Sequence, residues 1–415
     1  MTTVVIANQL VDGTGGPVIA EPTLVIEGGL ITDVRSGHRE VPEGAELLDY
    51  RGHTLFPGMI DAHVHSNLTG DGAEHDDIMR QDEAFLGVTI AHAARTALEA
   101  GTTTVRDVGS RDGTVFAARE GFRRGYGDAP RMLVTGPPVT MTGGHMRWFG
   151  GEADGVEGVR KAVRDRIGQG ADWIKAVGSG GGTPNTFSHL PALNREEVTA
   201  IADEAHRLGV KVTMHCLNGE AMKNAVAGGV DGIEHGWFLA GEGKEQEFSS
   251  EIADMIAESG IHVTTTLSVG ETFLEAMKVQ AGTTGLSEAE AADVEGWKIT
   301  RQRTIEHFAR LRTHGVKFIG GTDAGWRFTR FDCMSMEAWL MTEGGMTAIE
   351  AIAACTGDSA KFLGIGNKVG GLITGMEADL FAVEGDPLGD LRGLANVGMV
   401  MQNGLLKVGG APGSR

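Results

Sequence analysis

Two histidines stand one residue apart in the segment Asp61-Ala62-His63-Val64-His65. Successive side chains of a β-strand point to opposite faces, so His63 and His65 share a face if this segment is extended. Two imidazoles on one face can bind a divalent metal ion through their neutral nitrogens. Two ordinary surface histidines at a strand end are the alternative interpretation, because the motif is short.

Three more potential ligands stand at the ends of short apolar runs. The runs Val212-Thr213-Met214-His215, Gly232-Ile233-Glu234-His235 and Gly320-Gly321-Thr322-Asp323 each end in a side chain that can bind a metal. A single histidine in such a place usually serves packing, but three separate runs rarely agree by accident. We therefore expect His215, His235 and Asp323 to join His63 and His65 at one metal site.

The elements that must position these residues follow from the wider pattern of the chain. Apolar runs alternate with stretches of helical character, which is typical of a parallel α/β fold. Eight such units in about 300 residues fit a (β/α)8 TIM barrel, whose catalytic groups lie at the carboxyl ends of the strands. The expected strands are Gly58–Ala62, Thr103–Val108, Met132–Thr135, Trp173–Val177, Lys211–Met214, Gly232–Ile233, His262–Thr266 and Val316–Gly320.

Two of the helices have clear sequence signals. The segment from Asp76 to Ala100 has regularly spaced apolar residues and ends before Gly101, so we predict one helix there. Asn194-Arg195-Glu196-Glu197 opens another helix as a capping box, and that helix ends at Gly209.

The two ends of the chain read as short strands and turns. Thr23–Ile26 and Leu380–Val383 are apolar runs beside turn residues, and Asn403-Gly404 is a strong hairpin signal. Neither end has enough strands to fold alone. We therefore predict a small β-sandwich domain formed by residues 1–57 and 365–415 around a barrel of residues 58–364.

The segment from Pro57 to His65 resembles the first-strand signature of the amidohydrolase superfamily, and the resemblance covers nearly the whole chain. Its members include dipeptidases and carboxypeptidases, several of them specific for Xaa-Pro bonds, and hydrolases of amides, ureas and carbamates. Motifs that are similar to the imidazolonepropionase-like branch are Gly143-Gly144-His145, Ala171-Asp172-Trp173-Ile174-Lys175, Gly178-Ser179-Gly180-Gly181, Ile233-Glu234-His235-Gly236 and Gly321-Thr322-Asp323-Ala324-Gly325.

Lys175, at the end of the fourth expected strand, distinguishes the subtypes of this superfamily. In binuclear members a lysine here is carboxylated on its amine and bridges two divalent metal ions. Only a neutral amine reacts with carbon dioxide, and burial beside cations favours that form. A lysine that pairs with Asp172 or Asp107 at the surface is the alternative.

The resemblance implies a mechanism of C–N bond hydrolysis. A metal-bridging hydroxide attacks the substrate carbonyl, while Asp323 binds a metal and acts as general base and then general acid. An aspartate that only caps the next helix is the alternative for Asp323. His145 is assigned to substrate binding or carbonyl polarisation, or else it bonds a nearby backbone carbonyl. Zinc suits the ligands, and manganese, cobalt or iron would suit them as well.

Aromatic and basic residues follow the expected strand ends and could form the substrate pocket. Trp148, Trp237 and Trp326 favour an apolar or aromatic group beside the scissile bond, and Arg327 could bind a carboxylate, as could Arg147 and Arg330. The aromatic side chains could instead pack loops against one another or against a neighbouring subunit.

Two other functions remain open at this point. A mononuclear deaminase or cyclic-amide hydrolase of the same superfamily, acting on a heterocycle, would use similar histidines but would not need Lys175. A catalytically silent barrel that serves as a structural partner would have lost ligands, whereas all the expected ones are present. Asp107 could orient a ligand, and Cys216 is expected to serve packing.

Charge and composition narrow the choice of partners. The chain of 415 residues has a formal net charge of −20, which disfavours nucleic acid and anionic membranes as partners. The three cysteines lack a Cys-x-x-Cys spacing, the N-terminus lacks an export signal, and no apolar run is long enough to span a membrane. We expect a cytoplasmic homo-oligomer that acts on a small molecule.

Overall fold

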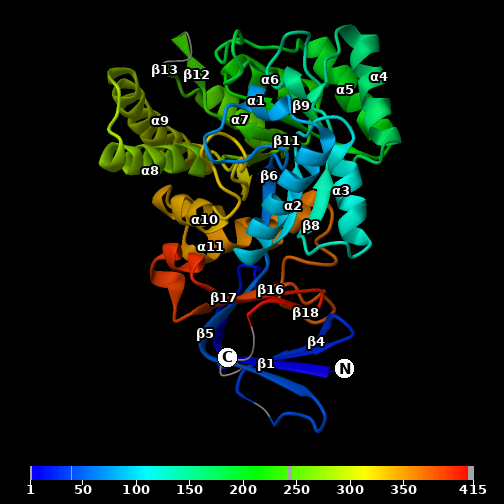
Figure 1. Ribbon diagram of the computed structural model, residues 1–415, viewed down its shortest axis with the longest axis vertical. Coiled ribbons are helices and arrows are strands. Elements are labelled where there is room, and N and C mark those ends of the chain that lie inside the picture. The colour runs from blue at the N-terminus through cyan, green and yellow to red at the C-terminus, as the bar shows by residue number, and fades with distance from the viewer. Residues whose placement is uncertain (1, 39, 242–244, 410–415) are drawn as a thin grey trace.

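The computed structural model describes residues 2–38, 40–241 and 245–409, and its elements form a barrel above a sheet (Figure 1). All eight runs predicted as barrel strands are strands, in the expected order, although several differ by one or two residues at their ends. They are β6 (Met59–Val64), β7 (Thr102–Asp107), β8 (Arg131–Val134), β9 (Trp173–Val177), β10 (Lys211–Cys216), β11 (Gly232–His235), β14 (His262–Thr264) and β15 (Lys317–Ile319).

The eight strands are parallel and close on themselves. Strands β6, β7 and β8 form one run of paired strands, and β9, β10, β11, β14 and β15 form another. The Asp172 amide donates to the Val134 carbonyl at 2.8 Å and so joins β8 to β9. On the opposite side, the Ala62 amide donates to the Gly320 carbonyl at 3.0 Å and joins β6 to β15. The expected TIM barrel is therefore confirmed.

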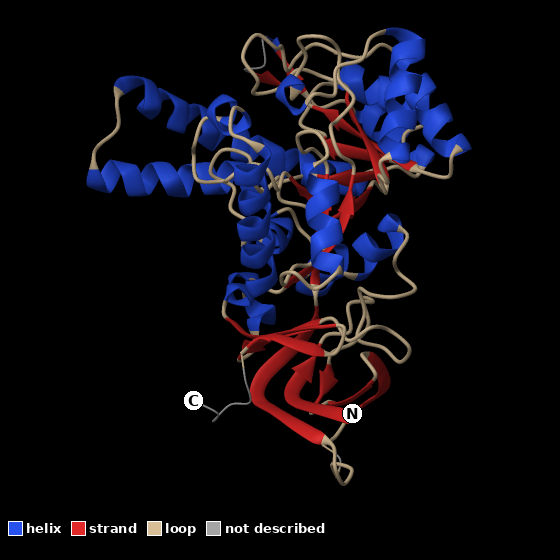
Figure 2. Ribbon diagram, turned by 45° about the vertical axis from the view of Figure 1, so that its right-hand side comes forward, coloured by secondary structure: helices blue, strands red, loops and turns tan. Residues whose placement is uncertain are grey.

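Helices cover the outside of the barrel strands, as Figure 2 shows by colour. Helices α8 and α9 project from the barrel together as an antiparallel pair (Figures 1 and 2). The helices are α1 (His75–Met79), α2 (Glu83–Glu99), α3 (Thr114–Arg123), η1 (Arg147–Phe149), α4 (Gly155–Gly168), α5 (Arg195–Arg207), α6 (Gly219–Gly228), α7 (Ser250–Ser259), α8 (Ser268–Thr283), α9 (Glu288–Thr313), α10 (Met334–Glu343), α11 (Ala348–Ala354), α12 (Gly357–Leu363), η3 (Pro387–Gly389) and η4 (Leu391–Ala395).

The helix predicted from Asp76 to Ala100 is two helices, which corrects the sequence-based prediction. The chain leaves α1 at Arg80, and Asp82 begins α2 by accepting a hydrogen bond from the Phe85 amide at 2.8 Å. An aspartate in the cap position satisfies a free N–H group and so favours a new helix over continuation of the old one. The capping box at Asn194 is confirmed at the start of α5.

Strands from both ends of the chain form one eight-stranded sheet. Their order is β18-β17-β16-β5-β1-β3-β4, with β2 paired to β1, and the C-terminal β16 lies antiparallel to the N-terminal β5. The division of this sheet into two packed layers, as in a sandwich, stays a prediction. The strands are β1 (Thr2–Leu10), β2 (Ile19–Ala20), β3 (Thr23–Glu27), β4 (Leu30–Arg35), β5 (Glu46–Pro57), β16 (Leu380–Glu384), β17 (Val397–Gln402) and β18 (Leu405–Val408).

Two local features connect this sheet to the barrel and fix its edge. Strand β5 continues into β6 through Gly58, where an added Cβ would lie 2.0 Å from the Thr103 hydroxyl, so only glycine fits. The predicted hairpin at Asn403 and Gly404 joins β17 to β18, and both residues have positive φ, as a type I′ turn requires.

A small strand pair, β12 (Leu239–Ala240) and β13 (Glu245–Gln246), follows β11. Among the described residues no helix is both long and apolar enough to cross a membrane.

Candidate metal centre and active site

The six residues predicted as metal ligands all lie at the carboxyl-end mouth of the barrel and are buried. They border one cavity of about 190 Å³. His63 is in β6 and His65 follows it, while Asp323 follows β15. Lys175, His215 and His235 belong to β9, β10 and β11, which are adjacent strands. The fold therefore brings together side chains that are separated by up to 260 positions in the sequence.

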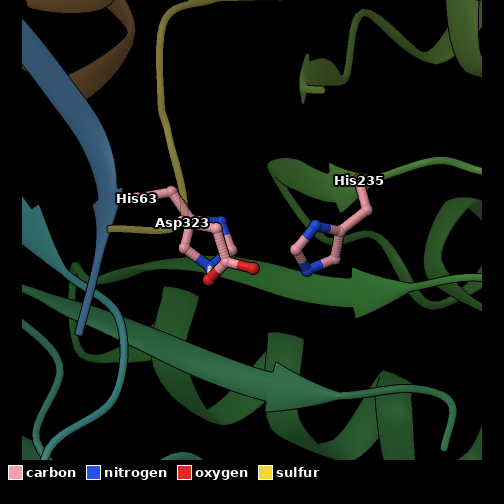
Figure 3. A group of neighbouring side chains, drawn as sticks. All are labelled: His63, His235 and Asp323. Carbon is pink, nitrogen blue, oxygen red and sulfur yellow. Dashed lines mark ion pairs between the residues drawn. The ribbon is translucent and has the colours of Figure 1, made fainter. Parts of the chain in front are cut away.

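The Asp323 carboxylate contacts both His63 and His65. Its Oδ1 atom lies 3.3 Å from Nε2 of His63 and 3.2 Å from Nε2 of His65. One donor atom each of His63, His235 and Asp323 lie within 4.8 Å of one another, and Figure 3 shows these three side chains pointing toward a common centre. Asp323 does not cap the next helix, because α10 begins at Met334 and its N-cap position is Cys333.

Two of these ligands depend on an uncommon backbone conformation. His235 has a φ of 73° and Asp323 has a φ of 64°, in the left-handed region that residues other than glycine rarely adopt. Both residues border the cavity. Strain of this kind is concentrated at functional sites, where the surrounding structure maintains it.

The ring nitrogens that face away from the centre are held by other groups. Nδ1 of His63 lies 2.7 Å from the Glu234 carboxylate, and Nδ1 of His65 lies 3.0 Å from the Gly109 carbonyl. Carboxylates and carbonyls accept hydrogen bonds, so both Nδ1 atoms donate and both Nε2 atoms keep a lone pair. His215 is oriented in the opposite sense, since its Nε2 atom lies 3.2 Å from the Gly180 carbonyl.

Glu234 and Arg106 are functional residues that the sequence analysis missed. Nη2 of Arg106 donates to Oε1 of Glu234 at 2.7 Å, and both side chains are fully buried. The Thr213 hydroxyl also bonds this carboxylate. The available signal was a charged residue in each of two otherwise buried strands, because such a residue needs a partner.

Lys175 is buried at 1% exposure, and its Nζ atom has no hydrogen-bond partner in the described part of the chain. Burial lowers the pKa of Lys175 to about 8, although the carboxylates of Glu234 and Asp323 act in the opposite direction. The surface pairing considered for this lysine does not form. Asp172 pairs with Arg119, and Asp107 accepts hydrogen bonds from Ser66 and Ser110.

Three of the other titratable groups of the site are shifted toward the forms that bind metals, and His63 is shifted the other way. Burial, with the neighbouring basic groups, holds the pKa values of His215 and His235 well below the usual range, so both imidazoles are neutral. Burial alone would raise the pKa of Asp323, but the neighbouring His63 and His65 side chains hold it well below its usual value. His63 itself has a raised pKa, because Asp323 and Glu234 outweigh burial and Lys175.

Asp107 lies behind the first ligand pair. Its carboxylate accepts from the backbone amide of Ser66 at 2.8 Å and from that of Gly109 at 3.2 Å. Ser66 follows His65 in the sequence, and the carbonyl group of Gly109 bonds Nδ1 of His65. Asp107 therefore fixes the backbone around His65 without contacting the cavity, and buried Cys216 packs in the core, as expected.

The cavity wall contains part of the predicted substrate set. Trp237, Trp326 and Arg327 border the cavity together with Trp297 of α9, which the sequence analysis missed. The sequence signal that could have identified Trp297 was a tryptophan within a helix, α9, whose other residues are mostly charged or polar. Trp148 is not among the lining residues; its ring lies 6.5 Å from that of Trp326 and 4.8 Å from that of Phe149, behind the wall.

Of the three arginines considered for carboxylate binding, Arg327 is the one that borders the cavity. Arg330 pairs with Asp332 at 3.1 Å, and Arg147 donates to the Pro184 carbonyl at 3.1 Å. The Arg327 guanidinium forms no ion pair with any described residue and lies 6.0 Å from the centroid of the Trp297 ring. His145 also borders the cavity, and its Nδ1 atom bonds the Thr183 hydroxyl rather than a backbone carbonyl.

Comparison with known proteins agrees with this arrangement. The sequence profile of the amidohydrolase family matches residues 54–406, which is most of the chain. The protein belongs to the amidohydrolase family. This assignment confirms the resemblance seen in the first-strand motif around His63 and His65.

Individual amidohydrolases that are similar to this one have been characterised. Ochratoxinase from Aspergillus niger is 28% identical over 94% of this chain and 82% of its own length. The crystal structure of a Xaa-Pro dipeptidase with methionine bound in its active site is 30% identical, covers 99% of this chain and all of its own, and has a TM-score of 0.87. A prolidase complexed with N-methylphosphonate-L-proline is 27% identical with the same coverage and a TM-score of 0.84. These names indicate a hydrolase that acts on C–N bonds.

The donor set of this amidohydrolase fits divalent metal ions. The protein buries an amine without a partner, neutral imidazoles and an ionised carboxylate around one cavity. Burying these groups together is unfavourable unless a cation or a similar charged group compensates them. Imidazole and carboxylate ligands of this kind suit zinc and related metals.

Proposed function

We propose that the protein is a binuclear metal-dependent hydrolase that cleaves a dipeptide or an N-acyl amino acid with a hydrophobic side chain. The observation that carries the proposal is Lys175, a buried amine without a partner among five other metal-binding side chains. A carboxylated Lys175 would supply an anionic oxygen ligand where the barrel otherwise offers a repelled cation. A mononuclear deaminase would not need a lysine there.

The six residues His63, His65, Lys175, His215, His235 and Asp323 would hold the two ions. When bound, such ions lower the pKa of a water molecule and polarise the substrate carbonyl group. Asp323, ionised at neutral pH, would accept the proton of the attacking water and pass it to the leaving nitrogen. Zinc is the metal that we expect first, given the ligand types.

The substrate class follows from the cavity wall. Trp237, Trp297 and Trp326 offer apolar surface for a hydrophobic side chain, and Arg327 has a guanidinium free for a carboxylate. His145 would contact the carbonyl oxygen. The names of the similar proteins, Xaa-Pro dipeptidase and ochratoxinase, support a substrate that joins a carboxylate-bearing amino acid to an acyl group.

Metal analysis by emission spectroscopy tests the first part of the proposal. About two ions per chain agrees with the binuclear site, about one ion favours the deaminase alternative, and none contradicts both. Release of an amino acid or of ammonia from a panel of dipeptides, N-acyl amino acids and heterocyclic amines tests the second part. Ammonia from a heterocycle, without amide cleavage, would overturn the proposed reaction.

Trp237→Ala tests the assignment of the apolar wall. The truncation removes contact area, so KM should rise more for a substrate with an aromatic side chain than for a small one. Trp148→Ala is the matched control, because that ring lies behind the wall. Equal increases for both substrates would show that Trp237 serves packing.

A further inference from the structure

The Thr183 hydroxyl has two neighbours that constrain its proton. Its oxygen lies 3.1 Å from the backbone nitrogen of Met146 and 2.7 Å from Nδ1 of His145. An amide N–H can only donate, so the Met146 amide occupies a lone pair of the Thr183 oxygen. The hydroxyl proton must therefore point elsewhere.

Nδ1 of His145 is the one acceptor that this hydroxyl reaches within the described residues. Thr183 is 2% exposed, so bulk water cannot serve in its place. A buried hydroxyl proton without an acceptor is costly, and this cost favours donation from Thr183 to Nδ1. A neutral His145 then carries its proton on Nε2.

The Nε2 atom lies on the edge of the ring away from the Thr183 hydroxyl, next to Gly181, which also borders the cavity. His145 borders the cavity, and Nε2 has no hydrogen-bond partner among residues 2–38, 40–241 and 245–409. Gly181 leaves the space that the ring occupies, since a Cβ at Gly181 would lie 2.5 Å from Nε2. The ring is therefore held on one side by a hydroxyl and opens on the other side to the site.

We propose that Thr183 is a positioning residue that fixes His145 as the Nε2–H tautomer, so that the ring donates a hydrogen bond to the carbonyl oxygen of the substrate. The identity of that oxygen rests on the proposed function, whereas the tautomer is a property of the protein alone. A donor fixed before the reaction stabilises the negative charge that develops on the oxygen. The opposite tautomer would present a lone pair to the same oxygen and repel it.

Nitrogen NMR of histidine-labelled protein tests the tautomer directly. Long-range ¹H–¹⁵N spectra of the Zn²⁺-loaded protein distinguish protonated from unprotonated ring nitrogens, and loss of signals in His145→Gln assigns the residue. We expect a protonated Nε2 in the wild type and in Thr183→Ser, and a mixture of tautomers in Thr183→Val. A protonated Nδ1 in the wild type, or an unchanged pattern in Thr183→Val, would overturn the proposal.

Kinetics test the consequence, with any substrate that the panel identifies. Thr183→Val should lower kcat severalfold with a small change in KM, because a ring that can rotate and change tautomer presents its donor in the transition state only part of the time. Thr183→Ser should recover most of the rate. Thr186→Val is the control for the structure of the loop, since the Thr186 hydroxyl bonds the backbone of Gly181 and of Thr183 but not His145.

Equal losses of kcat in Thr183→Val and Thr186→Val, both with wild-type NMR patterns, would show that the loop merely needs its hydroxyls for structure. If no member of the panel is cleaved, the proposed function fails. The NMR result would still decide the tautomer, so the two failures are distinguishable.

Discussion

Asp323 is the residue to which the proposed function assigns both metal binding and proton transfer. Its carboxylate is buried and is held ionised by His63 and His65, and its backbone has a left-handed conformation at the border of the cavity. A carboxylate in water would have none of these constraints. The role proposed for Asp323 therefore depends on both its negative charge and its shape. A substitution that keeps the shape and removes the charge separates these two contributions.

Asp323→Asn keeps the shape and removes the charge. We expect kcat/KM to fall by more than tenfold, which corresponds to over about 1.4 kcal/mol of transition-state stabilisation. Steady-state kinetics measures the loss, and circular dichroism checks that the fold is kept. Asp332→Asn, in an exposed ion pair of the same loop, is the control. A variant at Asp323 with near-wild-type activity would show that this residue is not the base.

Lys175 predicts a pH dependence of metal reconstitution. Carbon dioxide reacts with the neutral amine, and burial lowers the pKa of this amine to about 8. The neutral fraction therefore rises as pH increases from 6 to 8, so reconstitution of metal-free protein at a fixed carbon dioxide concentration should be more than about tenfold faster at pH 8. Recovered activity against time measures the rate. A pH-independent rate, or full activity of Lys175→Ala, would contradict carboxylation.

Glu234 determines whether Arg106 can be buried at all. In Glu234→Ala the Arg106 guanidinium stays buried without its partner, so we expect a loss of about 3–5 kcal/mol in the free energy of unfolding. Urea unfolding measures it. Glu99→Ala removes an exposed helical ion pair with Arg95 and should lower the free energy of unfolding far less, because solvent screens the pair. Equal losses of unfolding free energy in the two variants would contradict the idea that Arg106 needs Glu234 in order to be buried.

At the scale of elements, helix α8 begins without a capping side chain of its own. Glu337 of α10 supplies one, because its carboxylate accepts from the backbone amides of Leu267 at 3.0 Å and Ser268 at 2.8 Å. The carboxyl is fully buried, and burial raises its pKa to about 7 despite these two hydrogen bonds. Two helices that are distant in sequence are thus joined by one titratable group.

The raised pKa of Glu337 predicts a stability change with a definite sign. The folded state binds the proton more tightly than the unfolded state, so the contribution of this group is complete below the unfolded pKa of 4.5 and is lost as pH rises through about 7. Relative to the wild type, Glu337→Gln should gain about 3 kcal/mol between these pH values. Urea unfolding of both proteins at several pH values gives the difference. A pH-independent difference would contradict the shift.

At the scale of the molecule, the terminal sheet and the barrel share part of one core. Phe381 of β16 is fully buried and stacks on Phe56 of β5 at 5.3 Å between ring centroids. It also contacts the corner at Gly101, where a Cβ would lie 3.0 Å from its ring. Both rings belong to the cluster that contains the barrel residues Ile174 and Val212. The sheet therefore supports the underside of the barrel.

Phe381→Ala should destabilise the whole chain. Removal of a buried aromatic ring typically costs about 3–5 kcal/mol, through lost burial and the cavity that remains. Urea unfolding, followed by tryptophan fluorescence of the barrel, measures the change. Phe187→Ala, where the ring is 59% exposed, should change stability by under about 0.5 kcal/mol. An unchanged barrel transition in Phe381→Ala would show that the two parts unfold independently.

The eight barrel strands and the residues at their carboxyl ends could be predicted from local patterns in the sequence. Both are local signals: an apolar run makes a buried strand, and a residue such as His215 at its end must lie at the mouth of the barrel. The hairpin at Asn403-Gly404 and the capping box at Asn194 were equally local. The cap at Asp82 was missed, because the regular apolar spacing from Asp76 to Ala100 predicted a single helix.

The contacts between side chains from different strands and loops could not be predicted in this way. Arg106 and Glu234 are 128 positions apart, and Trp297 reaches the cavity from a helix that projects from the barrel. Trp148 follows a strand end as Trp326 does, yet packs behind it. Contacts of this kind depend on barrel closure and on the paths of loops. A residue's own sequence neighbourhood records its secondary structure, whereas its partners across the barrel are fixed by the packing of the entire chain.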